Sequence, residues 1–190
     1  RMVSVVFGTL LVLFIARINW VAGLFLAVHT YSIKYTSEVY LEALPFLLST
    51  LALFVYLRSE RVKIRWLVLS GVLLGLTASS KYVYALVGIA ILVDWCRAHF
   101  TDTAEVRSAF GRAVARVFLW GGVALLAFVI SDPYLWPNVV ERIGASIQYH
   151  LNFQQGEYVS TINYPWWQPL VWLSQGVAEY PGVVFIQWPS

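Results

Sequence analysis

This chain has 190 residues, of which 59% are hydrophobic and only 12% are charged, and its mean hydropathy is +0.69. Soluble domains carry about 25% charged residues, so this composition excludes an ordinary water-soluble globule and indicates that lipid solvates much of the chain. The net charge of +3 does not indicate nucleic-acid binding, because the basic residues stand at the ends of apolar runs and form no stripe. The single cysteine, Cys96, excludes a disulfide framework within the chain.

Six apolar runs indicate which segments of the chain are embedded in the membrane. They cover residues 2–16, 21–28, 43–57, 66–79, 82–95 and 114–130. Most are shorter than the about 20 residues of an ideal transmembrane helix, although flanking Trp, Tyr and Arg side chains can extend them into the interface. The second run crosses a bilayer only if it continues to about Lys34. The predicted fold is therefore all-α, a polytopic transmembrane bundle of about six segments over residues 1–131.

The basic residues between the runs predict an orientation. Nine of the 13 Lys and Arg residues lie in or beside the first, third and fifth gaps, namely Arg17, Arg58, Arg61, Lys63, Arg65, Arg97, Arg107, Arg112 and Arg116. Only Lys34, Lys81 and Arg142 lie on the opposite side, with Arg1 at the terminus. By the positive-inside rule the odd gaps are cytoplasmic, and Cys96 with them. The remaining gaps and the tail then face outward from an inner (plasma) membrane.

Two sets of glycines predict close helix packing. Gly71 and Gly75 form a GxxxG pattern in the fourth run, and Gly121 and Gly122 are adjacent in the sixth. Small residues let two helices approach each other closely. For both sets we favour packing inside one bundle over dimerisation.

Residues 132–190 predict a different, extracytoplasmic region that is rich in aromatic residues and proline. It holds five of the nine Trp, five of the eleven Tyr and six of the seven Pro residues. One piece, near residues 139–151, predicts a short helix with Asn138 as its N-cap and Glu141 in its first turn. Its apolar face predicts a helix that lies on the outer membrane surface, and this face is formed by Val140, Ile143, Ile147 and Leu151.

Ionisable residues beside apolar segments are costly in lipid and therefore mark candidate sites. Three outward clusters qualify: Glu38 with Lys34 and Glu42, Lys81 in a tight turn, and Asp132 with Tyr134 and Trp136, followed by His150. Each has a structural alternative. Lys81 can reach the lipid headgroups, Glu38 can be a solvated or helix-terminal charge, Asp132 can brace the turn at Pro133, and His150 can be solvated.

The order of these features resembles the core of the GT-C membrane glycosyltransferases, and more narrowly the protein O-mannosyltransferase and aminoarabinose-transferase group of glycosyltransferase family 39. Two stretches carry the resemblance: WLVLSGVLLGLTASSKY at residues 66–82 and DPYLWPN at residues 132–138. It implies an enzyme that takes a sugar from a polyprenyl-phosphate carrier and passes it to a protein, lipid or glycan acceptor on the outer membrane face.

The resemblance also implies roles for individual residues. Lys81 matches a lysine that meets the carrier phosphate, and Glu38 matches an acidic position that helps to bind a divalent metal or the donor phosphate, where many relatives carry Asp. The tail matches an outward loop that covers the site, so its acceptor-side or sugar-side candidates are Asp132, Tyr134, Trp136, His150 and Trp166. The family's general base lies in an earlier outward loop. We therefore expect a fragment that lacks this base and shows no transfer alone.

Two other classes remain open. A transporter or flippase would have broken helices, charges at the bilayer midplane and an internal repeat, and the sequence has no repeat. A non-enzymatic membrane scaffold would give no reason for an outward tail so rich in Trp, Tyr and Pro. No Walker loop, HExxH or GxSxG pattern points to another enzyme class.

Overall fold

The computed structural model describes residues 2–29, 33, 42–58, 63–100, 106–154 and 167. Almost all of these residues are helical and none lies in a strand, which confirms the all-α prediction. Contacts divide the chain between Val139 and Val140 into two compact units. The first unit is a row of packed helices, and the described part of the second consists almost entirely of one helix, α8 (Val139–Gln154).

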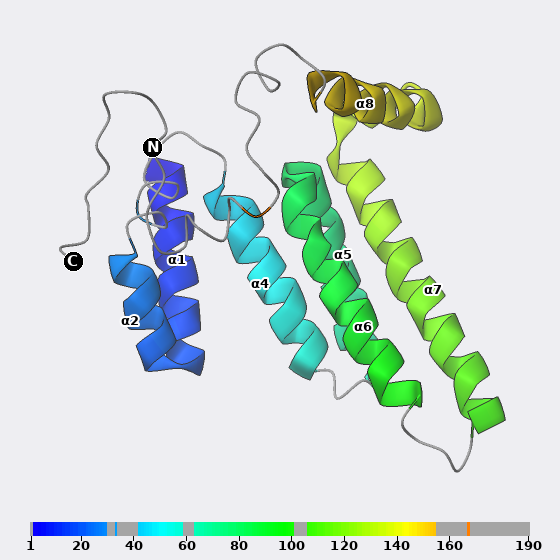
Figure 1. Ribbon diagram of the computed structural model, residues 1–190, viewed down its shortest axis with the longest axis horizontal. Helices are drawn as coiled ribbons and strands as arrows, with labels where there is room; N and C mark the ends of the chain where they lie inside the picture. The colour runs from blue at the N-terminus through cyan, green and yellow to red at the C-terminus, as the bar shows by residue number, and fades with distance from the viewer. Residues whose placement is uncertain are drawn as a thin grey trace. The chain divides into compact units, whose positions relative to one another are not determined.

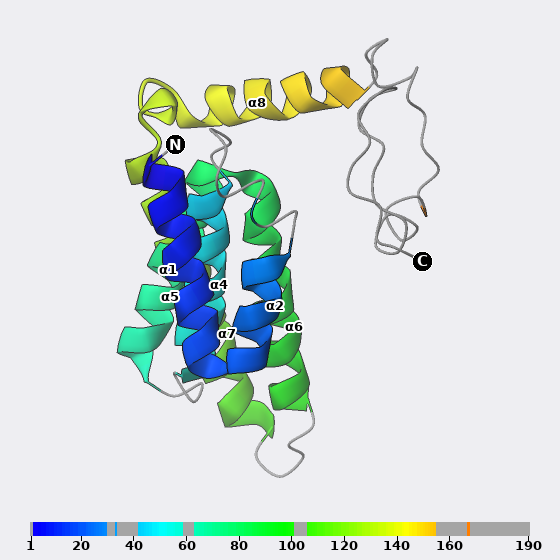
Figure 2. The ribbon, with the colours of Figure 1, turned by 90° about the vertical axis from the view of Figure 1, so that its left-hand side faces the viewer.

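Helices α1 (Met2–Ile18) and α2 (Trp20–Val28) form a tight hairpin at one side of the first unit (Figures 1 and 2). Asn19 makes the turn, because its Oδ1 accepts hydrogen bonds from the backbone N–H groups of Val21 at 3.0 Å and Ala22 at 3.1 Å. The nine residues of α2 rise about 13 Å, which is less than half the hydrocarbon thickness of a bilayer. Of the predicted continuation to Lys34, only His29 and Ile33 are described, and His29 has extended backbone at the end of α2.

Helix α4 (Ala43–Arg58) is antiparallel to α5 (Ile64–Ser80), and α7 (Val106–Ser131) runs in the same direction as α5, which packs between the other two (Figure 1). Pro45 falls in the first turn of α4, where its missing N–H costs no helical hydrogen bond. Helix α1 packs on the other side of α4. The third and fourth predicted runs therefore match α4 and α5 to within two residues at each end.

The last two predicted runs differ from the structure at their ends. The fifth opens as the 3₁₀ helix η1 (Tyr82–Leu86) and continues as α6 (Val87–Phe100), five residues beyond its predicted end. Helix α7 begins eight residues before the predicted start at residue 114. Hydropathy marks only the apolar part of a helix, and α7 starts with a polar, Arg-containing segment. Its residues Ala113–Ser131, with a mean hydropathy of 2.2, are the one described stretch long and apolar enough to cross a membrane.

The core lies where α4, α5, α6 and α7 meet. Its buried members are Tyr56, Leu67, Ile91, Trp95 and Trp120. Ser70, which is fully buried in α5, links three helices: its hydroxyl donates to the carbonyl of Ala52 at 2.9 Å and accepts from the Trp120 indole N–H at 3.4 Å. These two hydrogen bonds fix the register of α5 against α4 and α7, because a shift of α5 would leave the buried Ser70 hydroxyl unsatisfied.

The GxxxG glycines make the contact between α5 and α7. A Cβ built on Gly71 would meet the Trp120 carbonyl oxygen at 2.8 Å, and one on Gly75 would meet the Ala127 Cβ at 2.7 Å. Packing inside one bundle, the favoured interpretation, is therefore confirmed for this pair. For Gly121 and Gly122 it is wrong, because both are exposed and a Cβ on either would meet nothing within 4 Å.

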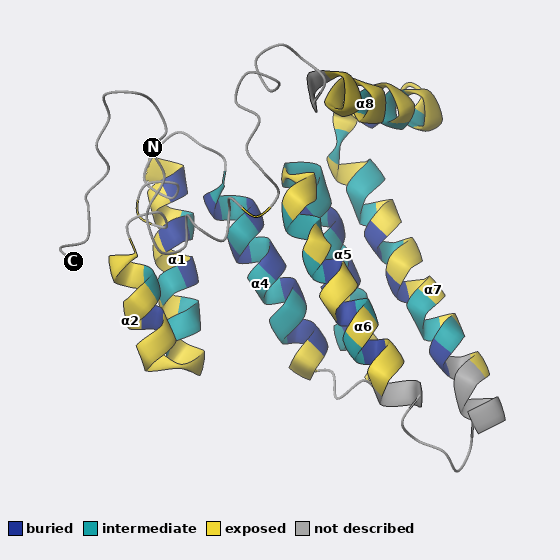
Figure 3. Ribbon diagram, in the orientation of Figure 1, coloured by how far each residue is buried: buried dark blue, intermediate teal, exposed yellow. Residues whose placement is uncertain are grey.

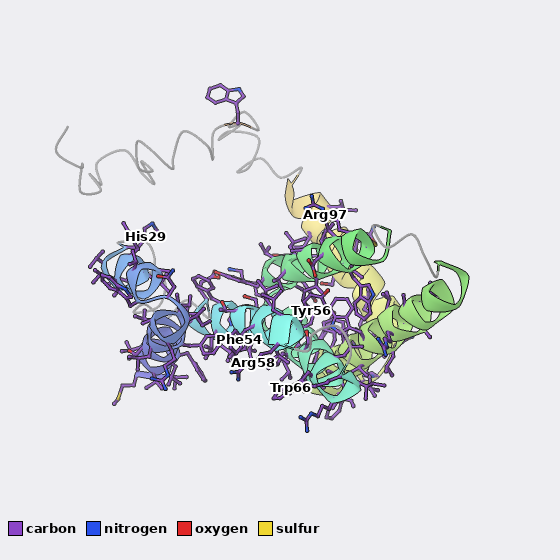
Figure 4. All side chains as sticks on the ribbon, turned by 90° about the horizontal axis from the view of Figure 1, so that it is seen from below. His29, Phe54, Tyr56, Arg58, Trp66 and Arg97 are labelled. Carbon is purple, nitrogen blue, oxygen red and sulfur yellow. The ribbon has the colours of Figure 1, made fainter. Side chains whose placement is uncertain are left out.

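The two ends of this bundle differ in charge. We call the end where α4 begins and α5 and α7 finish the Lys81 end, and the opposite one the Arg58 end (Figure 1). In Figure 4 the Arg58 end faces the viewer and carries Arg58, Trp66 and Arg97. The Arg58 and Arg65 guanidinium groups each lie 5.5 Å from a neighbouring ring centroid, those of Phe54 and Trp66. The basic residues thus gather where the sequence pattern expected them.

Helix α8 of the second unit begins directly after Asn138, as predicted, and extends three residues past the predicted end. Figure 3 shows most of α8 as exposed, and within its predicted apolar face Val140, Ile147 and Leu151 are exposed while Ile143 is half-buried. Val140 is 84% exposed and Ile147 is 56% exposed. Such a face is stable only against another apolar phase or partner.

Candidate functional site

The Lys81 end brings together an acid and a base from two adjacent, antiparallel helices. Glu42 precedes α4, and its carbonyl accepts the first helical hydrogen bond from Phe46 at 3.1 Å. Lys81 follows α5, and its N–H donates to the Thr77 carbonyl at 2.8 Å. An acid at a helix N-terminus and a base at a helix C-terminus both interact favourably with the helix dipoles. Antiparallel packing then places the two side chains opposite each other.

Hydroxyl side chains close the last turns of α5 below Lys81. Thr77 Oγ1 donates to the Leu73 carbonyl at 2.7 Å, and Ser79 Oγ and Ser80 Oγ donate to the Leu76 carbonyl at 3.0 and 2.9 Å. These are back-bonds from hydroxyl side chains to carbonyls of the preceding turn, within the helix. The chain then turns through an extended residue, Lys81, with φ −165° and ψ 117°. The predicted tight turn is therefore present, and it holds Lys81 at the tip.

The Lys81 ammonium forms a salt bridge with the Glu42 carboxylate. The two partners differ in exposure, since the lysine side chain is 46% exposed and the glutamate side chain only 14%. The carboxylate thus lies beneath the ammonium, with the cation toward the surface. This geometry leaves the ammonium able to meet a second anion while it stays anchored.

Aromatic contacts tie the turn at Lys81 to both neighbouring helices. The ring of Tyr84 lies 5.9 Å from that of Phe46 in α4, and the ring of Tyr82 lies 6.1 Å from that of Phe128 in α7. Each spacing is typical of favourable aromatic pairs. Because Phe128 is one turn below Asp132, the turn after α7 adjoins the turn after α5.

Asp132 takes the structural role that was left open for it. Its Oδ1 accepts from the Tyr134 N–H at 3.1 Å and caps the short 3₁₀ helix η2 (Pro133–Leu135). The Trp136 indole N–H donates a hydrogen bond to the Val129 carbonyl at 3.0 Å, and Leu135 is buried. Tyr134 and Trp136 remain more than half exposed, at 52% and 62%. They provide aromatic surface at the same end of the bundle as Lys81.

The remaining predicted site residues are not among the described residues of the first unit. His150 is exposed on α8, in the second unit, where its Nδ1 lies 2.7 Å from the Ser146 carbonyl oxygen. Glu38, Lys34 and Trp166 lie outside the described residues, so the pairing of Glu38 with Lys81 stays a prediction. Among the residues that the structure does describe, no three His, Cys, Asp or Glu side chains are grouped to hold a metal ion.

Glu42 was named in the sequence only as a neighbour of Glu38, and its pairing with Lys81 was missed. A usable signal was present. An acid directly before one helix and a lysine directly after the next antiparallel helix are brought to the same end of the pair. Matching helix-terminal charges across each predicted hairpin would have found the contact.

A second polar contact lies inside the bundle, between α4 and α6. The hydroxyl of buried Tyr56 donates to Asp94 Oδ2 at 2.8 Å, and the Tyr56 ring lies 6.0 Å from that of Trp95. Figure 4 shows Tyr56 among the side chains between the helices. Asp94 therefore has a structural role, because its carboxylate accepts a hydrogen bond from a buried hydroxyl between the helices.

Comparison of the chain with protein-family models, curated proteins and solved structures finds no match.

Proposed function

We propose that this chain forms the multi-pass core of an integral membrane glycosyltransferase. The enzyme moves a sugar from a polyprenyl-phosphate carrier to a protein, lipid or glycan acceptor on the outer face of the inner membrane. The observation that carries the proposal is the anchored, half-exposed Lys81 ammonium at one end of an apolar bundle. The described residues supply the donor-phosphate part of the site.

Membrane insertion is supported by the composition and by the surface of the helices. Exposed apolar side chains cover α1, α2 and α7, among them Phe25 at 70% and Phe118 at 76% exposure. Water would make such a surface aggregate, whereas lipid solvates it. Helices α1, α4 and α5 each rise about 25 Å, and interfacial Trp and Arg side chains can make up the difference to a bilayer core of about 30 Å. About six membrane segments belong to this proposal.

The orientation follows from charge. The Arg58 end faces the cytoplasm under the positive-inside rule, so the Lys81 end faces outward. There Lys81 lies at the level of lipid headgroups, which is where the phosphate of a membrane-embedded carrier lies. Exposed Tyr134 and Trp136 on the adjoining turn suit the apolar faces of a sugar.

The chemistry needs little beyond this arrangement. A sugar phosphate is an activated donor, so transfer requires a base for the acceptor hydroxyl and a cation for the departing phosphate. Lys81 supplies the cation. Glu38 is proposed to assist at the phosphate or at a divalent metal, and the base is assigned to no residue of this chain.

The test is transfer by the complete protein in membranes, with a polyprenyl-phosphate sugar as donor. Lys81→Ala should lower the rate roughly 10²–10³-fold, the usual cost of removing a donor aimed at developing charge. It also leaves the Glu42 carboxylate without its partner. The double variant Lys81→Ala/Glu42→Gln removes that penalty and should remain inactive, which separates loss of function from loss of fold.

Two further variants complete the design. Lys81→Arg keeps a cation at the site and should retain more transfer than Lys81→Ala. Lys63 is a lysine at the Arg58 end and serves as the matched control, so the variant Lys63→Ala should retain full transfer. Full activity in Lys81→Ala, or an equal loss in Lys63→Ala, contradicts the assignment.

A further inference from the structure

Glu42 gives the Lys81 site a fixed negative charge as well as a positive one. The carboxylate is only 14% exposed and stands at the N-terminus of α4, where a negative charge interacts favourably with the helix dipole. The Lys81 ammonium is 46% exposed and is the partner nearer the surface. An incoming anion therefore meets the ammonium first, with the carboxylate held close behind it.

We propose that Glu42 suppresses the preference of the Lys81 site for a doubly charged phosphate monoester, so that a singly charged phosphodiester binds about as well. The inference rests on the proposed function and deepens it. Glu42 is a specificity-determining residue here, because it acts on the ligand through its charge and its hold on Lys81. A lone surface ammonium would instead attract the doubly charged species more strongly.

The proposed reaction makes the phosphate of the carrier more negative. Transfer breaks the bond between the sugar anomeric carbon and a phosphate oxygen and forms a bond from that carbon to the acceptor oxygen. The acceptor hydroxyl proton leaves to a base, and the carrier keeps the bonding electron pair. The phosphodiester of the donor, with charge −1, becomes a monoester with about −1.5 to −2 at pH 7.

The carboxylate therefore acts differently on donor and product. It repels each added negative charge, and at the effective dielectric of a protein surface this repulsion amounts to a roughly tenfold change in affinity. Glu42 lowers the affinity for both phosphates, and it lowers that for the product monoester more. The pair thus favours loading of the donor and release of the spent carrier.

The experiment is a binding titration with the 190-residue chain in nanodiscs of zwitterionic lipid, followed by native mass spectrometry. The probes are a polyprenyl phosphate, its methyl diester and the uncharged polyprenol of the same length. The unchanged chain should bind the two phosphates within about threefold of each other and both more tightly than the alcohol. Glu42→Gln should prefer the monoester over the diester by roughly tenfold. Glu42→Asp, the matched control that keeps the charge, should retain the original ratio.

The outcomes separate this inference from the proposal beneath it. If Lys81→Ala abolishes the preference for phosphate over alcohol while Glu42→Gln leaves the monoester-to-diester ratio unchanged, the inference fails and the phosphate site stands. If the unchanged chain binds neither phosphate better than the alcohol, the proposed function fails first. Should Glu42→Gln not fold, the unchanged chain still decides, because a tenfold preference for the monoester there overturns the inference.

Discussion

Gly75 of α5 lies directly against the backbone of α7 at Ala124, so closely that even a methyl group has no room. A Cβ there would meet the Ala124 carbonyl oxygen, the Ala127 Cβ at 2.7 Å and the Phe128 backbone nitrogen at 2.9 Å. The contact lies one to two turns below Asp132 and therefore sets the spacing between the turns at Lys81 and Asp132. Packing of α5 and the geometry of the candidate site are coupled through this glycine.

The first prediction concerns this contact. Gly75→Ala should lower the free energy of unfolding by about 1–3 kcal/mol, the usual cost of overpacking a close contact. Gly122→Ala is the matched control, since the same methyl group would meet nothing within 4 Å and should be neutral or slightly stabilising. Titration of the protein from mild detergent into SDS, followed by circular dichroism, measures both. Equal effects of the two substitutions would contradict the packing described for Gly75.

The second prediction concerns the hydrogen bond between Tyr56 and Asp94. Tyr56→Phe keeps the ring against Trp95 and removes only the hydroxyl, so we expect a loss of about 1.5–3 kcal/mol, the range for a hydrogen bond to a charged group. A double-mutant cycle with Asp94→Ala isolates the pair. The coupling energy should account for most of the Tyr56→Phe effect, and additive single effects would show that the bond contributes nothing.

Hydropathy and charge in the sequence were enough to predict the helices of the bundle. The runs at 43–57 and 66–79 became α4 and α5 with small changes, because each is one apolar segment bounded by charges or by a tight turn. Helix α7 was predicted too short since its first turns are polar. Gly121 and Gly122 were assigned to a packed face on composition alone, and only the rotation of α7 about its axis shows that they face away from α5.

The site was predictable in part, for a different reason. Lys81 was identified from its place in a short turn between two apolar runs, a purely local signal. Its partner Glu42 lies 39 residues earlier, and such a contact depends on which helices are neighbours. Asp132 was left with two interpretations, and a hydrogen bond of 3.1 Å to the Tyr134 N–H gives it a capping role.

The third prediction tests the proposed orientation. Cys96 is the single cysteine, lies in the last turns of α6 and is exposed, so its reactivity with a polar reagent depends on which side of the membrane it faces. A membrane-impermeant maleimide added to intact cells should leave Cys96 unlabelled until the membrane is permeabilised. Ser131→Cys in a Cys96→Ser background supplies the control, since residue 131 is exposed at the opposite end and should be labelled in intact cells. The reverse pattern would invert the proposed topology.

The last prediction concerns the apolar face of α8, on which three of the four side chains are exposed. Val140 and Ile147 are 84% and 56% exposed, and they share this face with the apolar residues Ile143 and Leu151. An amphipathic helix of this kind is stable when its apolar face enters the headgroup and acyl boundary by about 5–10 Å. We therefore expect α8 to lie in the membrane surface, with Val140 and Ile147 toward lipid and Ala145 and Asn152 toward water.

Spin labels attached to single cysteines in the Cys96→Ser background measure this directly in liposomes. Val140→Cys and Ile147→Cys should give high collision rates with oxygen, which concentrates in lipid, and low rates with a water-soluble nickel complex. Ala145→Cys and Asn152→Cys are matched controls, because both positions are exposed on the other side of the same helix and should show the opposite preference. The comparison holds the label and the helix constant, and all four positions are exposed, so a difference reports depth. If all four labels were equally accessible to the nickel complex, α8 would lie in water and its apolar face would need another partner.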